Sequence, residues 1–334
     1  MKNVSVLGID LAKNIFQLHG VNSNGDTVIK RKVKRSQLIA YIQKLPNCLI
    51  GIEACGASHY WAREFKKLGH EVKMMPPQYV KPYVKTNKTD AADAEAICEA
   101  VTRKNMRFVP DKSIASQDIQ SMHRARKRLV RNKTSLVNEM RGLLMEYGIF
   151  IPKAVRNFNK YMPKIMKENN LTNSFKETLQ ELYEEYEFIK IKIENYDLRI
   201  EKHTEESPTC KRLLTVKGIG KLTASILSSI DIKEFNNGRE FAAWLGLTPR
   251  QHSSGGKDVF LGISKRGDSY IRSLLVHGAR IALHWSARYD DKLSKWAQSV
   301  KERRGHNKAC VALANKLARI AFSVMRNNTE YKLA

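Results

Sequence analysis

Four carboxylates stand at positions where acids could act together on one reaction. Asp10 and Glu53 each end a short apolar run, so the residues beside them are expected to be buried. Asp90 and Asp93 are three positions apart and would share one face of a helix. A nearly buried acid requires a partner, and Mg²⁺ prefers carboxylate and water oxygens and bridges phosphate. The pattern therefore indicates a divalent-metal site.

Each of these acids also has a structural explanation when it is taken alone. Asp10 could cap a strand, Glu53 could be a surface acid, and the other two could face the positive end of a helix. Four carboxylates from three separate elements nevertheless favour Mg²⁺, or Mn²⁺ in its place. Two such ions about 4 Å apart would activate an attacking oxygen and stabilise a leaving oxygen in phosphodiester chemistry.

A second candidate for chemistry is the serine in the sequence Ser253-Ser254-Gly255-Gly256-Lys257. We expect a Gly- and Ser-rich loop there, from Thr248 to Gly267. A serine hydroxyl needs a base, a metal or a strong electrostatic neighbour to become nucleophilic, and four nearby cations would neutralise developing charge: Arg250, Lys257, Lys265 and Arg266. Taken alone, the segment is more typical of a polar surface turn.

The charge of the chain indicates a polyanionic partner. Its 334 residues include 59 Lys and Arg and 33 Asp and Glu, a net charge of +26. Residues 177–206 contain ten acids and four bases, whereas residues 122–133 contain six bases and no acid. We expect the basic run to contact phosphates, and the alternative is a solvated helix face. The predicted contacts are Arg124, Arg126, Lys127, Arg128 and Arg131.

Residues 214–224 resemble a helix-hairpin-helix. A Gly218-Ile219-Gly220 turn between two helices would present backbone N–H groups to a DNA phosphate, with Lys221 beside it. Because Gly-x-Gly alone is a weak signal, an ordinary connection between two helices explains the segment equally well.

The apolar pattern predicts the elements that position these groups. Helices are expected at 35–45 and 58–68, and a further helix begins after Thr89 as its N-cap. A strand hairpin followed by alternating helices and strands predicts a mixed sheet covered by helices, an α/β fold that ends near Pro110. The expected strands are 4–10, 14–21, 27–33, 48–53 and 71–75.

Two long helical patterns follow. The first seam is interrupted by Arg126 and Lys133, whereas the second is continuous. This spacing predicts a coiled coil, antiparallel within one chain or formed between chains, with a compact bundle as the alternative. Further helices are expected at 269–285 and 307–325. The seam positions are Ile119, Met122, Leu129, Leu136, Met140, Leu143 and Tyr147 in the first, and Leu179, Leu182, Tyr186, Ile189, Ile193, Tyr196 and Ile200 in the second.

Several classes of protein are disfavoured. No apolar run approaches the roughly 18 residues of a membrane span, and the first residues lead into a strand without a signal peptide. The five cysteines are widely spaced and form no CxxC pair, which argues against a zinc site or a disulfide framework. The sequence favours a cytoplasmic protein that does not bind membranes.

The motifs together resemble a known family. Gly8-Ile9-Asp10-Leu11-Ala12-Lys13, Gly51-Ile52-Glu53-Ala54-Cys55-Gly56 and Lys88-Thr89-Asp90-Ala91-Ala92-Asp93-Ala94 are similar to the Asp-Glu-Asp-Asp domain of RuvC-like, RNase H-like transposases. Residues 241–250, 254–257 and 263–268 are similar to the carboxy-terminal domain of the same enzymes. Over almost its whole length the chain resembles bacterial insertion-sequence transposases of family one-ten, eleven-eleven subgroup, which are relatives of the Piv-type DNA invertases.

The resemblance implies an α/β plus all-α architecture. Its parts would be a RuvC-like domain at 1–110, a helical coiled-coil region at 111–207, and a helical transposase domain with the serine loop and the helix-hairpin-helix-like element at 208–334. Family members carry a catalytic serine in this loop, which we assign to Ser254 with Ser253 as the alternative. The four acids would bind Mg²⁺.

The resemblance also implies partners. The enzyme would cleave and rejoin donor and target DNA as a dimer or tetramer in the bacterial cytoplasm, at the nucleoid. A structured non-coding bridge RNA would specify both DNAs. Whether the acids and the serine meet within one protomer or between protomers is open at this stage.

Two other functions fit the same residues. A RuvC-like structure-selective endonuclease would hydrolyse DNA with water and use the serine loop only for binding. A non-enzymatic nucleic-acid-binding protein would tolerate the loss of all four acids.

Overall fold

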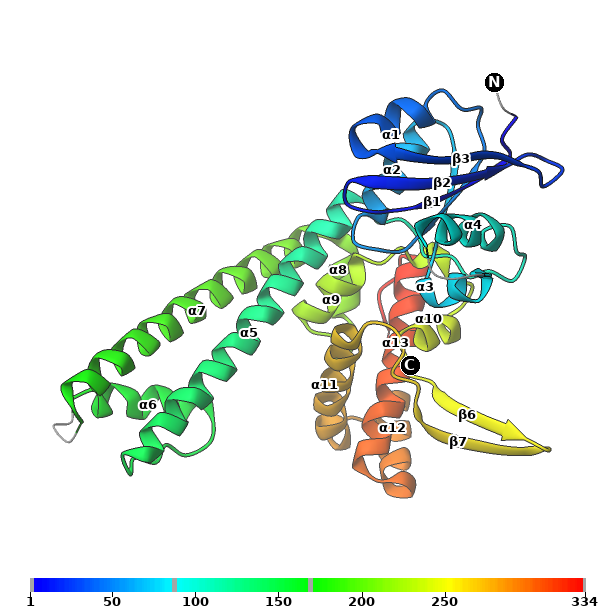
Figure 1. Cartoon of the computed structure of the whole chain (residues 1–334). Helices are drawn as coiled ribbons and strands as arrows, with labels where there is room; N and C mark the ends of the chain where they lie inside the picture. Colours follow the sequence, from blue (N-terminus) through cyan, green and yellow to red (C-terminus); the bar gives the residue numbers. More distant parts are fainter. Residues whose placement is uncertain (1–2, 86–88, 168–170, 333–334) are drawn as a thin grey trace. The chain divides into compact units, whose positions relative to one another are not determined.

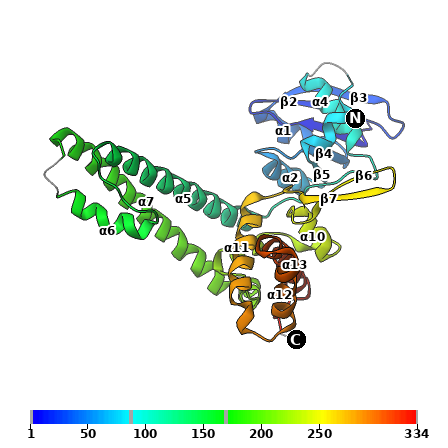
Figure 2. The same ribbon diagram turned by 90° about the horizontal axis from the view of Figure 1, so that it is seen from below.

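The computed structural model describes residues 3–85, 89–167 and 171–332, so Lys88 of the third acidic motif lies outside the described residues. The chain forms two compact units, residues 1–113 and 114–334. Figure 1 shows their elements, and Figure 2 shows the same chain turned by 90°. In the part of the chain that the structure describes, no helix has the length and apolar character needed to cross a membrane.

The first unit is built on a five-stranded mixed sheet with the strand order β3-β2-β1-β4-β5. The first three strands are antiparallel, and β4 and β5 continue the sheet in parallel with β1. The five strands lie where the sequence predicted them, which confirms that apolar runs bounded by polar turns identify buried strands. They are β1 (Val6–Asp10), β2 (Ile15–Val21), β3 (Thr27–Lys34), β4 (Leu49–Glu53) and β5 (Glu71–Met75).

Helices cover both faces of this sheet (Figures 1 and 2). Leu7 and Ile9 of β1 are fully buried in a cluster with residues of α1 (Arg35–Ile42) and α2 (Ser58–Lys67). The residue between them, Gly8, packs against α4 (Asp90–Ala100) on the opposite face. Two short segments, α3 (Pro77–Val80) and the 3-10 turn η1 (Lys81–Tyr83), precede α4. The mixed α/β layering predicted for this part is confirmed.

The second unit begins with three helices, α5 (Ile114–Glu146), α6 (Val155–Ile165) and α7 (Asn173–Glu206). Helices α5 and α7 pack side by side within one chain (Figures 1 and 2). They run antiparallel: Arg126, early in α5, bonds to Asp197, late in α7, and Tyr147 just beyond α5 stacks on Phe175 at 4.1 Å between ring centroids.

The predicted seams fit the two helices unequally. All seam positions of α7 are buried or half-buried, as expected. In α5 the buried side chains shift from Leu143 to Leu144 and include Val137 and His123, which the heptad pattern did not select. A straight helix drifts relative to a 3.5-residue repeat, and the α6 segment adds Phe158 and Met162 to the same core. A regular coiled coil stays a prediction.

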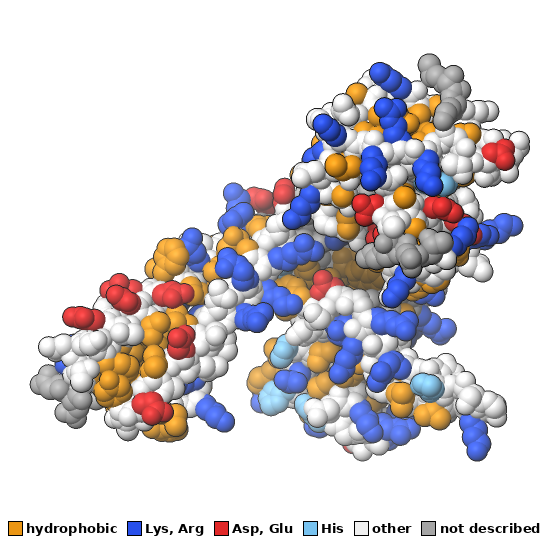
Figure 3. Space-filling view, in the orientation of Figure 1, with side chains coloured by type: hydrophobic (Ala, Val, Ile, Leu, Met, Phe, Trp, Pro, Cys, Tyr) orange, Lys and Arg blue, Asp and Glu red, His pale blue; other side chains and the backbone are white. Residues whose placement is uncertain are grey.

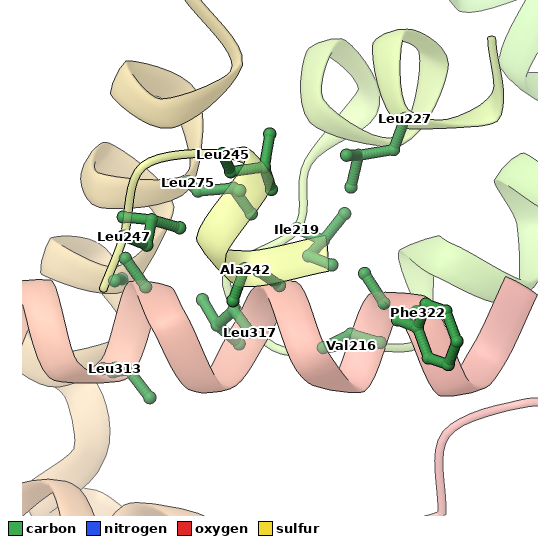
Figure 4. Close-up of a cluster of buried hydrophobic side chains, with 14 of the residues drawn as sticks. Val216, Ile219, Leu227, Ala242, Leu245, Leu247, Leu275, Leu313, Leu317 and Phe322 are labelled. Carbon is green, nitrogen blue, oxygen red and sulfur yellow. The ribbon is translucent and has the colours of Figure 1, made fainter. Parts of the chain in front are cut away.

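The rest of the second unit is a helical domain around α13 (His306–Asn327). Leu313 and Leu317 of this helix pack with Ala242, Leu245 and other buried side chains in one core (Figure 4). The helices predicted at 269–285 and 307–325 are confirmed. The surrounding elements are α8 (Pro208–Leu214), α9 (Lys221–Ser228), η2 (Ile232–Glu234), α10 (Gly238–Trp244), α11 (Ser269–Trp285), η3 (Ser286–Arg288) and α12 (Lys292–Arg304).

The connection between α8 and α9 contains the predicted Gly-Ile-Gly turn. Gly218 has a positive φ of 92°, and it packs backbone to backbone against α11: a Cβ on Gly278 would lie 1.9 Å from the Gly218 carbonyl oxygen. Packing therefore explains Gly218, whereas an added Cβ on Gly220 would meet nothing within 4 Å. Their use as a phosphate contact stays a prediction, as does the division of the chain into three parts.

Candidate active site

The two strand-end acids lie at the same edge of the sheet. Strands β1 and β4 are adjacent and parallel, with Ile9 paired to Ile52, so Asp10 and Glu53 follow at neighbouring positions on the two strands. Ile9 and Ile52 are fully buried, whereas the two acids are half-buried. The sequence therefore positions both carboxylates by burying the residue before each of them.

Helix α4 brings the other two acids toward this edge. Along the helix, the Cys98 Sγ lies 3.7 Å from the Val6 carbonyl oxygen, and the Ala94 carbonyl lies over Gly8. One helical turn thus spans two residues of β1, and the next turn leads to the end of the strand. That turn contains Asp90 and Asp93, and the predicted N-cap is confirmed because the Thr89 Oγ1 accepts a hydrogen bond from the Ala92 N–H at 3.2 Å.

The edge does not form a complete metal cage. Among the residues that the structure describes, no group of three or more His, Cys, Asp or Glu side chains could hold a metal ion. We refer to Asp10, Glu53 and the first turn of α4 as the acid edge. It brings oxygen donors suited to Mg²⁺ to one side of the sheet, and four-acid coordination stays a prediction.

An unpartnered oxygen beside Asp10 was not foreseen from the sequence. Gln17 is paired directly with Asp10 across β1 and β2, and it is 6% exposed. Its Oε1 is buried without a hydrogen-bond partner, as is Nδ1 of His19 two residues along the strand. Burial lowers the pKa of His19. The available signal was the pair of polar residues alternating within an otherwise apolar strand.

The serine segment is a β-hairpin, so the expectation of a loop from Thr248 to Gly267 was wrong. Strands β6 (Pro249–Ser254) and β7 (Lys257–Ile263) pair in antiparallel fashion around Gly255 and Gly256, whose φ values are 57° and 76°. Positive φ at both central residues is typical of the tight turn that joins twisted strands. The sequence obscured the strands because β6 buries no side chain. We refer to β6 and β7 as the serine ribbon.

The two candidate serines lie on opposite faces of the ribbon, because side chains alternate along a strand. Ser254 is paired with Lys257 and shares its face with His252. Ser253 lies on the other face, where Gln251 donates a hydrogen bond to its Oγ at 2.8 Å. A cation therefore accompanies Ser254, which favours it over Ser253 as a group that approaches phosphate.

The four cations assigned to the serine lie at the two ends of the ribbon, and all are exposed. Lys257 adjoins the tip. Arg250, Lys265 and Arg266 lie near the base, where the Ser264 N–H bonds to the Thr248 carbonyl at 2.8 Å. The Arg266 carbonyl accepts a hydrogen bond from Arg272 at 2.9 Å, which fixes the base to α11.

The predicted phosphate contacts of the long helices differ in their surroundings. Arg124, Lys127, Arg128 and Arg131 are exposed. Arg126 is half-buried and binds Asp197 through two hydrogen bonds, with its Nε 2.5 Å from Oδ1, and Lys221 forms an ion pair with Glu201. Both acids lie on α7, so each of these two bases already has a partner within the chain. Figure 3 shows acidic side chains gathered on the arm formed by the long helices and basic ones over much of the remaining surface.

Comparisons with known proteins identify the family. Residues 210–294 match the model described as "Transposase IS116/IS110/IS902 family", and residues 7–149 match an Asp-Glu-Asp-Asp transposase model of the same group. A "Probable family 20 transposase" of Pseudomonas aeruginosa is 46% identical over 99% of both chains. The "Transposase for insertion sequence element IS1111A" of Coxiella burnetii is 41% identical over 99% of this chain and 92% of its own length.

A more distant relative extends the group. The "Pilin gene-inverting protein" of Moraxella lacunata is 25% identical over 97% of both chains. The resemblance inferred from the motifs is thereby confirmed. The chain belongs to the IS116/IS110/IS902 transposase family of DNA-cleaving and DNA-rejoining enzymes.

Proposed function

We propose that this transposase exchanges DNA strands with a serine nucleophile and a divalent metal. The observation that carries the proposal is the pairing of Ser254 with Lys257 on one face of an exposed ribbon. A hydroxyl in that position can approach a phosphodiester, and the ammonium group can neutralise charge that develops on the phosphate oxygens. The acid edge supplies the second group of chemistry-bearing residues.

The residues that would hold Mg²⁺ are Asp10, Glu53, Asp90 and Asp93. Their hard oxygen donors suit the ion. The Oε1 atom of Gln17, beside Asp10, is buried and accepts no hydrogen bond, so a further oxygen at this edge has a lone pair available. When bound, the ion would lower the negative charge of the phosphate and favour the ionised form of a nearby hydroxyl. The carboxylates themselves would orient one another and the ion at the end of β1.

The serine step is a transesterification. The Ser254 Oγ forms a bond to phosphorus, one P–O bond of the DNA backbone breaks, and the leaving DNA oxygen takes up a proton equivalent to the one that serine loses. The serine–phosphate ester keeps the bond energy, so a DNA hydroxyl from another strand can reverse the step without ATP. Rejoining rather than hydrolysis follows from this intermediate.

A guide and an assembly complete the proposal. We infer that a structured bridge RNA selects donor and target DNA and that the enzyme acts as a dimer or tetramer. Support comes from the family resemblance and from the net charge of +26, which suits more than one nucleic-acid strand. Purifying the protein with its co-expressed nucleic acid and sequencing what accompanies it tests the RNA component. Recovery of random host RNA alone would contradict it.

The decisive experiment compares the two serines. Wild-type protein with Mg²⁺ and a nicked DNA substrate should give a protein–DNA adduct that resists denaturant. Ser254→Ala should give neither adduct nor strand exchange, whereas the matched control Ser253→Ala should give both. Wild-type adduct formation by Ser254→Ala would eliminate this residue as the nucleophile. Cleavage without any adduct in all three proteins would indicate a structure-selective endonuclease instead.

The acid edge is tested in parallel with a readout other than activity. Asp10→Asn should abolish strand exchange and weaken binding of Mn²⁺, followed by the electron paramagnetic resonance signal of the free ion. The melting temperature should change little, because the substitution preserves shape. Unchanged Mn²⁺ binding would remove Asp10 from the metal site.

A further inference from the structure

Helix α13 has an unusual charge pattern. The chain contains no Asp or Glu between Glu302 and Glu330, yet α13 alone contains four bases. Three of them, Lys316, Arg319 and Arg326, line one surface hollow; Arg319 and Arg326 are exposed and Lys316 is half-buried. A row of like charges on one helix face is destabilising unless another group compensates for it.

These cations surround a hollow. Its volume is about 580 Å³, and it is lined by residues of α10 and α13, among them Asn237 and Ser323. Arg239 of α10 joins the three bases of α13 at this hollow. The two helices approach closely at Gly238, where an added Cβ would lie 3.1 Å from the Arg319 Cα. Fold packing thus brings four positive side chains together.

No carboxylate lines the hollow, and none of the four bases forms an ion pair within the described chain. The nearest acid in sequence, Glu240, accepts hydrogen bonds from the backbone N–H and the side-chain amide of Asn236, both at 3.0 Å. Lys316 lies 4.4 Å from the centroid of the Trp296 ring, which holds its ammonium group in place. The concentration of positive charge is therefore not neutralised internally.

We propose that this surface, the α10–α13 hollow, docks the phosphate backbone of duplex DNA. Lys316 and Arg326 are ten residues apart, about 15 Å along the helix. Because phosphates of one strand follow each other at roughly 3.4 Å along the duplex axis, the row can face about four of them. Asn237 and Ser323 add neutral hydrogen-bonding groups of the kind found at backbone contacts. The inference builds on the DNA reaction proposed above and adds a binding surface separate from Ser254.

The test measures duplex binding across a range of salt concentrations. A triple variant, Arg239→Gln with Arg319→Gln and Arg326→Gln, should flatten the slope of log affinity against log salt by about 0.9 for each lost contact, or about 2.7 in all. Fluorescence anisotropy of a labelled duplex gives the slope. Ser254→Ala serves as the parent for every variant, so binding is measured without cleavage and a failed nucleophile assignment does not affect the result.

Two controls decide between outcomes. The matched triple Arg303→Gln, Arg304→Gln and Lys308→Gln removes three exposed bases from the same acid-free stretch, outside the hollow, and should leave the slope close to that of the parent. Equal flattening by both triples would overturn the proposal, because only net charge would matter. A slope that changes for single-stranded RNA but not for duplex DNA would overturn it as well. Circular dichroism should show all variants folded, since each replaced side chain is exposed.

Discussion

The acid edge and the serine ribbon bring their functional groups to the surface in opposite ways. At the acid edge, Asp10 and Glu53 follow Ile9 and Ile52, which are fully buried in the sheet. On the serine ribbon, every residue of β6 is exposed. Tertiary packing therefore fixes the acids, whereas the turn and the cross-strand pairing of β6 with β7 position Ser254.

This difference matters for catalysis because metal ligands and nucleophiles have different requirements. A metal site loses affinity when its ligands shift, so rigid strands suit it. A nucleophile that forms a bond to DNA must enter a groove or meet a distorted backbone, and an exposed two-stranded ribbon is narrow enough to do so. We expect mutations of the buried residues that position the acid edge, such as Gly8, to act through packing, and mutations on the ribbon to act locally.

The largest effect is expected for Gly8→Ala. The new Cβ would lie 2.3 Å from the Ala94 carbonyl oxygen and 2.5 Å from the Cys98 backbone nitrogen, and backbone atoms cannot move aside. Overpacking of this kind should lower the free energy of unfolding of the first unit by about 3 kcal/mol or more. Denaturant unfolding measures it. Gly56→Ala is the control, because an added Cβ there meets nothing within 4 Å. Equal stability of both variants would show that α4 is not clamped on β1.

An intermediate effect should come from His123 in the unit that carries the ribbon. Burial, followed by the charge of Arg126, lowers the pKa of His123 from 6.5 to about 4, and the ring lies 3.0 Å from the Tyr270 hydroxyl and 3.1 Å from the Ser225 hydroxyl. Between pH 4 and pH 6.5, His123 therefore binds a proton in the unfolded protein but not in the folded protein. The stability is therefore complete above pH 6.5 and falls as the pH approaches 4, by up to about 3 kcal/mol.

His123→Gln removes this titration. Thermal unfolding of the variant should depend less on pH between 4 and 6.5 than that of the wild type. Some dependence should persist, because burial also lowers the pKa of His203 in the same unit. An identical pH profile for both proteins would contradict the assignment.

The smallest effect is expected on the ribbon. Gly255 has a φ of 57°, and an added Cβ would meet nothing within 4 Å. Gly255→Ala should therefore cost only about 1 kcal/mol of backbone strain, confined to the hairpin. Hydrogen exchange should accelerate in β6 and β7 while the melting temperature stays unchanged. Gly262→Ala is the control, since its glycine has neither a positive φ nor a close neighbour. A large drop in melting temperature for Gly255→Ala would show that the ribbon is part of the core after all.

The same contrast explains how far the sequence could predict the structure. The strands and helices of the first unit were predicted because apolar alternation reports burial directly, and Thr89 was a readable N-cap. The sequence also predicted which elements carry the four acids: two at strand ends and two in the first turn of a helix. Their mutual distances did not, because side-chain geometry at an edge depends on the packing of α4 over Gly8.

The serine ribbon escaped prediction for a physical reason. Strand β6 buries no side chain and the apolar run Val259-Phe260-Leu261 of β7 is exposed, so no alternation of buried and exposed residues marked the two strands. The Gly255-Gly256 pair was an informative feature, but it also suits a loop. The partner of Arg126 was invisible for another reason: Asp197 is distant in sequence, and only the antiparallel fold of α5 on α7 brings the two together.

Side chains alternate along β6, so the number of residues before the two serines decides which of them faces the same side as Lys257. A single residue inserted between Pro249 and Ser253 would turn every later side chain of the strand to the other face, so the two serines would exchange places. Two inserted residues would restore the original arrangement. The length of this short strand, odd or even, thus decides which of the two serines shares a face with Lys257. Under the mechanism proposed above, insertion or loss of one residue there should abolish strand exchange although both serines remain in the chain.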